Sequence, residues 1–102
     1  MDMNQMMQQA QKMQAELMRA QEEVSGMTYT ATAGGGMVEA TATGEGRIES
    51  LKIDPEAVDS DDVEMLEDMV LAAVNEALRG VAAAGEQRMA AATGGMSIPG
   101  LF

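Results

Sequence analysis

Residues 27–53 read MTYTATAGGGMVEATATGEGRIESLKI, and the fold class follows from this stretch. Apolar and polar side chains alternate with a period of two, and β-branched threonines are frequent. Such alternation is typical of strands with one covered face. The glycines at 34–36 and the Gly-Glu-Gly sequence at 44–46 have the composition of turns. The stretch therefore predicts a three-stranded antiparallel meander.

A long helix is expected ahead of this sheet, over residues 3–24, because the segment contains no glycine or proline. Its apolar residues form a heptad seam, made of Met3, Met6, Ala10, Met13, Leu17, Ala20 and Val24. Ser25 and Gly26 are expected to end the helix. A helix of this length spans about 30 Å, more than a small sheet needs for cover. It could lie on its own sheet, or it could pack on a partner or project as an arm.

A second helical region is expected over residues 61–92, after Asp54 and Pro55 close the sheet. Asp61 and Glu64 have the spacing of a capping box, and carboxylates in a first turn suit the positive end of the helix dipole. Gly80 could bend this helix, since glycine is a poor helix former.

The whole chain reads as one α+β domain over residues 1–102, in the order α-β-β-β-α, with residues 93–102 as a flexible tail. Its core is poor in large side chains. The chain has 17 Ala and 12 Met, but Val, Leu, Ile, Phe and Tyr together number only 18. Alanine gains little from burial, and a three-stranded sheet leaves open edges. A homodimer that shares its core is therefore expected.

The sequence contains no cysteine and no histidine. Disulfides, thiolate metal sites and thiol nucleophiles are thereby excluded, and a reducing compartment is the natural setting. The N-terminal residues lack the basic region and apolar run of a signal peptide. No run approaches the roughly 20 apolar residues that cross a bilayer. We therefore expect a cytoplasmic protein with no membrane partner.

An enzyme is the least favoured class. Only carboxylates, hydroxyls, one tyrosine and six basic side chains are available for proton transfer or nucleophilic attack. The acidic residues between 54 and 62 lack the third ligand and the glycine of a calcium loop. The glycines at 34–36 precede neither a helix nor a Lys-Ser or Lys-Thr pair, so they predict a hairpin turn rather than a phosphate site. No catalytic residue, metal, cofactor or small-molecule substrate is predicted.

Lys12 and Arg19 are the two basic residues of the first predicted helix. They are seven residues apart, so they share one face beside the seam, and the first 15 residues carry no net charge. The chain as a whole carries a net charge of −11, which opposes a polyanionic partner. The two side chains can be interpreted as phosphate contacts or as ordinary solubilising charges.

Seven local patterns follow one another along the chain: QAQKMQ (9–14), QEE (21–23), GGGMV (34–38), IDP (53–55), EMLED (64–68), AAVNEA (72–77) and GMSIPGLF (95–102). In this order and spacing they resemble the YbaB/EbfC family of bacterial nucleoid-associated proteins, over nearly the whole chain.

The resemblance implies a tweezer-like homodimer, joined through its sheet regions, with helices as arms. It also implies binding to duplex DNA with little sequence preference, a changed DNA conformation, and effects on gene expression and nucleoid organisation. The arms of the family carry the DNA contacts, which points to Lys12, Arg19 and, more weakly, Arg88. The alternative is a protein–protein interaction module whose Met-rich helices and apolar tail bind another protein.

Overall fold

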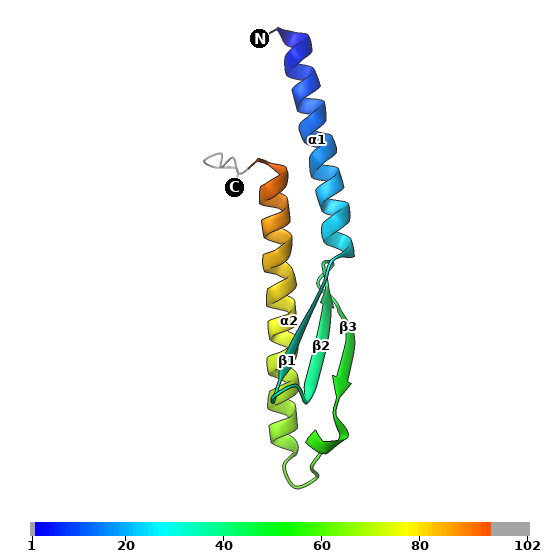
Figure 1. Cartoon of the computed structure of the whole chain (residues 1–102), viewed down its shortest axis with the longest axis vertical. Coiled ribbons are helices and arrows are strands. Elements are labelled where there is room, and N and C mark those ends of the chain that lie inside the picture. The colour runs from blue at the N-terminus through cyan, green and yellow to red at the C-terminus, as the bar shows by residue number, and fades with distance from the viewer. Residues whose placement is uncertain (1, 95–102) are drawn as a thin grey trace.

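The computed structural model describes residues 2–94, in which two long helices accompany a small sheet (Figure 1). The elements are α1 (Met3–Gly26), β1 (Thr28–Ala33), β2 (Val38–Thr43), β3 (Ile48–Ile53), the short 3-10 helix η1 (Pro55–Ala57) and α2 (Val63–Ala92). The sheet has the order β1-β2-β3 and is antiparallel throughout. The predicted α-β-β-β-α order and meander are therefore confirmed. From residue 95 onward the expected tail lies outside the described residues.

Helix α1 ends two residues later than predicted, at Gly26 rather than at residue 24. Asp2 caps its start by accepting a hydrogen bond from the Gln5 N–H at 2.7 Å. At the other end, Gly26 does not adopt the positive φ of a glycine stop. The helix ends instead because Met27 turns to an extended backbone, φ −68° and ψ 150°, and leads into β1.

Helix α2 begins at Val63, later than the predicted start at residue 61. The cap is Asp62, whose carboxylate accepts a hydrogen bond from the Met65 N–H at 3.2 Å. Asp61 does not form the expected capping box. Its own N–H donates to the Asp59 carboxylate at 2.9 Å, so Asp61 belongs to the preceding turn.

Gly80 does not interrupt α2, which continues through it to Ala92. A Cβ atom at this position would collide with the ring of Tyr29, which comes from β1. The glycine therefore serves packing: it lets the tyrosine ring lie directly against the helix backbone.

The core lies between α2 and the first two strands. It consists of alanine and valine side chains, namely Ala31, Val38, Ala40, Ala42, Ala73, Ala77 and Val81. The only large side chain that is fully buried within residues 2–94 is Val38. Helix α2 packs on β1 and β2 and barely contacts β3. The sheet is thus only partly covered, and the core is as thin as the composition suggests.

Helix α1 does not lie on the sheet. It packs antiparallel against the C-terminal half of α2, beyond the end of the sheet, and its N-terminal half projects freely (Figure 1). The molecule measures 72 × 24 × 16 Å, with a radius of gyration of 19.7 Å, whereas a compact chain of about 100 residues has about 13 Å. The structure therefore favours the second arrangement considered above, in which the first helix is an arm.

Candidate nucleic-acid interface

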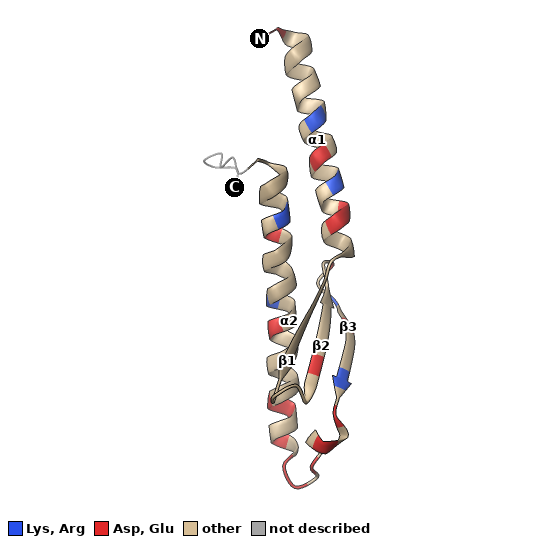
Figure 2. Cartoon of the chain, in the orientation of Figure 1, with Lys and Arg blue, Asp and Glu red and all other residues tan. Residues whose placement is uncertain are grey.

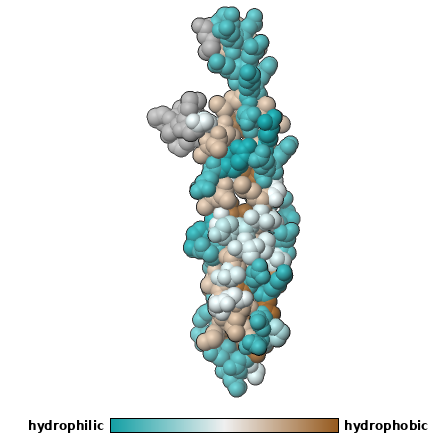
Figure 3. Space-filling view, viewed as in Figure 1, coloured by the Kyte–Doolittle hydropathy of each residue, from teal (hydrophilic) through white to brown (hydrophobic). Residues whose placement is uncertain are grey.

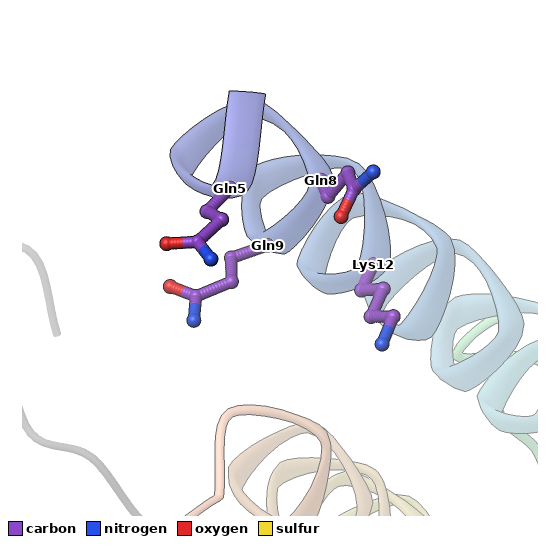
Figure 4. A pocket seen from close by; sticks show the side chains of 4 residues that line it. All are labelled: Gln5, Gln8, Gln9 and Lys12. Atoms are coloured by element: carbon purple, nitrogen blue, oxygen red, sulfur yellow. The ribbon is translucent and has the colours of Figure 1, made fainter. Parts of the chain in front are cut away.

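The projecting half of α1 presents amide and ammonium groups to solvent. Gln5, Gln8, Gln9 and Lys12 line a hollow of about 310 Å³ on this part of the helix. Figure 4 shows Gln5, Gln9 and Lys12 extending to the same side of α1. These groups can donate hydrogen bonds to phosphate or base oxygens, and the amides can also accept them. The four side chains that line the hollow are therefore polar, and none of them is negatively charged.

A stripe of alternating charge runs from this surface toward the sheet. Its residues are spaced three and four apart on α1, and they are Lys12, Glu16, Arg19 and Glu23. The Arg19 guanidinium donates to the Glu16 carboxylate at 3.2 Å. Lys12 forms no ion pair within the part of the chain that the structure describes. The pair of Glu16 and Arg19 was not predicted, although its three-residue spacing is a recognisable helix-pair signal.

Arg88 joins the same stripe from α2. Its guanidinium donates to the Glu23 carboxylate across the interface between the two helices. The Arg88 side chain is 23% exposed, whereas that of Arg19 is 64% exposed. In the structure Arg88 thus lies near the stripe that contains Arg19. Its guanidinium is engaged by Glu23, however, and helps to hold α1 against α2. No local sequence signal could have linked Glu23 to Arg88, because they are 65 positions apart.

The hydrogen bond from Arg88 holds the pKa of Glu23 below its ordinary value, and the positive charge of Arg19 acts in the same direction. Glu23 in turn raises the pKa of Arg88. A carboxylate with a lowered folded-state pKa contributes stability above its unfolded-state pKa, and the contribution is lost as the pH falls through the folded-state pKa. The contact between the helices therefore weakens in acid.

Arg88→Met is expected to return the pKa of Glu23 toward its ordinary value, because the main hydrogen bond to the carboxylate is removed. Carboxyl NMR titration of Glu23 measures this change. Arg79→Met is the matched control, since Arg79 pairs with Glu76 within α2 at 2.7 Å and does not contact Glu23. An unchanged Glu23 pKa in Arg88→Met would contradict the interhelical pair.

Nearly half of the acidic residues lie far from the arm. Eight of the 17 lie between residues 54 and 68, at η1 and the start of α2. Figure 2 shows this acidic end opposite the N-terminus along the 72 Å axis. Charges in water are screened beyond about 8–10 Å at physiological salt. The net charge of −11 therefore does not determine the field around Lys12.

No group of three or more Asp or Glu residues within residues 2–94 is arranged to hold a metal ion. Over the same residues, none of the helices has the length and apolar character of a membrane span.

The comparisons with known proteins agree with one another. The model of the YbaB/EbfC DNA-binding family matches residues 1–96. A nucleoid-associated protein of Thermoanaerobacter pseudethanolicus is 54% identical over 99% of this chain and 91% of its own length. One of Pelotomaculum thermopropionicum is 52% identical over 99% of this chain and 96% of its own length. The crystal structure of an uncharacterized Helicobacter pylori protein superposes with a TM-score of 0.66 at 26% identity, covering 95% of this chain and 99% of that one.

Proposed function

Since this chain belongs to the YbaB/EbfC DNA-binding family and is a nucleoid-associated DNA-binding protein, we propose that it holds duplex DNA with the α1 arms of a homodimer. The observation that carries the proposal is the projecting half of α1, which holds Lys12 and extends away from the acidic end of the molecule (Figure 2). On this proposal the protein is cytoplasmic, works at the nucleoid, and has no catalytic activity and no small-molecule substrate.

Lys12 and Arg19 are the proposed phosphate contacts. Arg19 is engaged with Glu16 in the free protein, but an exposed ion pair of this kind contributes only about 0–1 kcal/mol. A phosphate can therefore replace the carboxylate at little cost. Arg88 is a weaker contact, because binding DNA would compete with its bond to Glu23.

Contacts to phosphate carry no sequence information, so this mode of binding implies little sequence preference. The two arms of a dimer would hold a duplex at two places, which changes the path of the DNA between them. We propose that protein bound along the nucleoid in this way affects its organisation and the expression of the genes it covers.

An apolar face that the chain leaves open is the proposed dimer interface. We name it the α2–β3 face, made of Leu51, Ile53, Leu66, Val70, Leu71 and Val74. The α2 residues line a groove of about 460 Å³ together with Glu67. Leu51 and Ile53 remain 43% and 37% exposed.

The register of the sheet places these β3 residues beside the core. Leu51 pairs with Ala40 and Ile53 pairs with Val38, so the β3 side chains point to the sheet face on which α2 packs. Helix α2 covers β1 and β2 on that face but hardly reaches β3. In Figure 3 the visible face of the projecting part of α1 is mostly hydrophilic, and the apolar colours gather lower, over α2 and the sheet. A second copy that covered this face would bury these side chains, and burial of each large one contributes about 1.5–3 kcal/mol.

Leu71→Glu is expected to shift the protein from dimer to monomer, because it places a charge in the centre of an apolar interface. Light scattering after size exclusion at about 10 µM measures the change. Met18→Glu is the matched control, since Met18 is similarly exposed but lies on α1. A wild-type protein that is monomeric at this concentration, or a Leu71→Glu variant that stays dimeric, would contradict the assignment.

The binding proposal is tested by titrating labelled duplexes of two unrelated sequences at about 50 mM salt, where phosphate contacts are strong. The expected result is binding to both with affinities within about threefold, and weaker binding to single strands of the same length, because Tyr29 and Phe102 are the only aromatic side chains for stacking. Energy transfer between dyes on the two duplex ends should change as the protein binds. Absence of binding at this salt would overturn the arm proposal and favour the interaction-module alternative.

A further inference from the structure

The heptad seam of α1 is covered over only half its length. Near the sheet, Ala20 is fully buried, and Leu17 and Val24 are half-buried in the part of α1 that packs along α2. Toward the N-terminus the same seam continues without cover. We call this part the open seam: Met3, Met6, Ala10 and Met13. Met3 is 76% and Met6 is 55% exposed, while Met13, next to the covered part, is half-buried.

Helix α2 stops where the open seam begins. Gly85 lies against Val24, since a Cβ on this glycine would be 3.1 Å from the valine Cγ1. The helices are antiparallel, so at an equal rise of 1.5 Å per residue Ala92 comes level with about Leu17. The end of α2 is well defined. The Thr93 hydroxyl donates to the Ala90 carbonyl oxygen at 2.9 Å, and Gly94 takes the positive φ of a closing turn, 66°.

The remainder of the chain has the length and the character to continue along α1. Residues 95–102 read GMSIPGLF, with four apolar side chains and no charged side chain. Eight extended residues reach about 26 Å. The open seam from Met3 to Met13 is a rise of about 15 Å. The chain that follows Gly94 therefore starts at one end of the open seam and is long enough to reach the other.

We propose that residues 95–102 dock on the open seam of the same chain, with Met96, Ile98, Leu101 and Phe102 against the methionines of α1. Methionine side chains are flexible and adapt to an irregular apolar segment. The docked segment continues the packing of α2 along α1. It leaves Lys12, on the neighbouring stripe, free to contact phosphate. Through this contact the C-terminal end of the chain supports the DNA-binding arm along its length.

Disulfide trapping tests this directly, because the chain has no cysteine of its own. Full-length Met6→Cys/Leu101→Cys is oxidised and followed on non-reducing gels. Gln8→Cys/Leu101→Cys is the control, since residue 8 lies on a different face of α1. A docked segment raises the effective concentration of the two thiols, so the first pair should form an intramolecular bond at least about tenfold faster. Equal rates, or a bond only between two chains, would overturn the proposal, the latter in favour of docking on the partner.

A second measurement needs no covalent bond. The chain has no tryptophan, so Phe102→Trp introduces the only indole. Its emission is expected at a shorter wavelength than that of a free C-terminal peptide, and Met3→Gln with Met6→Gln should return it to the peptide value. Emission that is unaffected by the two glutamine substitutions would contradict docking on the open seam.

Discussion

Lys12→Glu with Arg19→Glu is expected to lower the affinity for duplex DNA by at least about 100-fold at 0.1 M salt. Each substitution replaces an attraction to phosphate by a repulsion, and a dimer carries each one twice. The loss of Arg19 also leaves Glu16 without its partner at 3.2 Å, so the stripe on α1 becomes uniformly acidic. Both residues are exposed, so the fold should be retained.

The matched control is Arg47→Glu with Lys52→Glu. These residues are also basic and exposed, but they lie after β2 and on β3 rather than on an arm. Both double variants change the net charge by the same four units. The control should bind duplex DNA within about threefold of wild type, because neither residue lies on the proposed contact surface of α1. Equal losses in the two variants would show that total charge, not the arm, governs binding.

Gly44→Ala is expected to lower the free energy of unfolding by about 2–4 kcal/mol. Gly44 follows β2, and a Cβ atom there would overlap the carbonyl group of Val24 at the end of α1. The Gly44 N–H also donates to the Met27 carbonyl oxygen at 2.9 Å, so the backbone is tied in place. The neighbouring atoms are main chain and cannot move aside as a side chain would. Thermal unfolding should show a decrease on the order of 10 °C.

Gly26→Ala is the control for this effect. Gly26 lies at the same junction of α1 and the sheet, but a Cβ atom there would have no neighbour within 4 Å. Because Gly26 is in the last turn of the helix, alanine should be neutral or stabilising by up to about 1 kcal/mol. Similar unfolding temperatures for the two variants would contradict the close approach of Gly44 to α1.

The strands and the order of the elements could be predicted because they depend on local periodicity. Ala31, Val38 and Ala40 alternate with polar neighbours along their strands, and all three are buried. The positions of Lys12 and Arg19 on one face of α1 also follow from helical spacing alone. Features that repeat within a few residues are therefore readable from the sequence.

The remaining features depend on contacts between distant segments. From the sequence Gly80 is a possible bend in the helix. In the structure it leaves room for the ring of Tyr29, which comes from β1. The bond between Arg88 and Glu23 joins two helices, so helix spacing could not reveal it. For the same reason the seam of α1 did not show whether the helix covers the sheet or projects. The surface that covers part of the α1 seam belongs to α2. The covered length of α1 therefore depends on where α2 ends.

The most direct test of the arm as the DNA-binding element is the salt dependence of duplex affinity. It should be measured for wild type beside the neutral variant Lys12→Gln with Arg19→Gln. Four phosphate contacts per dimer correspond to a slope of about −3 to −4 for log affinity against log salt concentration. We expect this slope for wild type and a much shallower slope, with weak binding, for the variant, in which only Arg88 remains of the proposed contacts. A variant that keeps the wild-type slope would contradict the account, because the released cations would then come from contacts elsewhere on the protein.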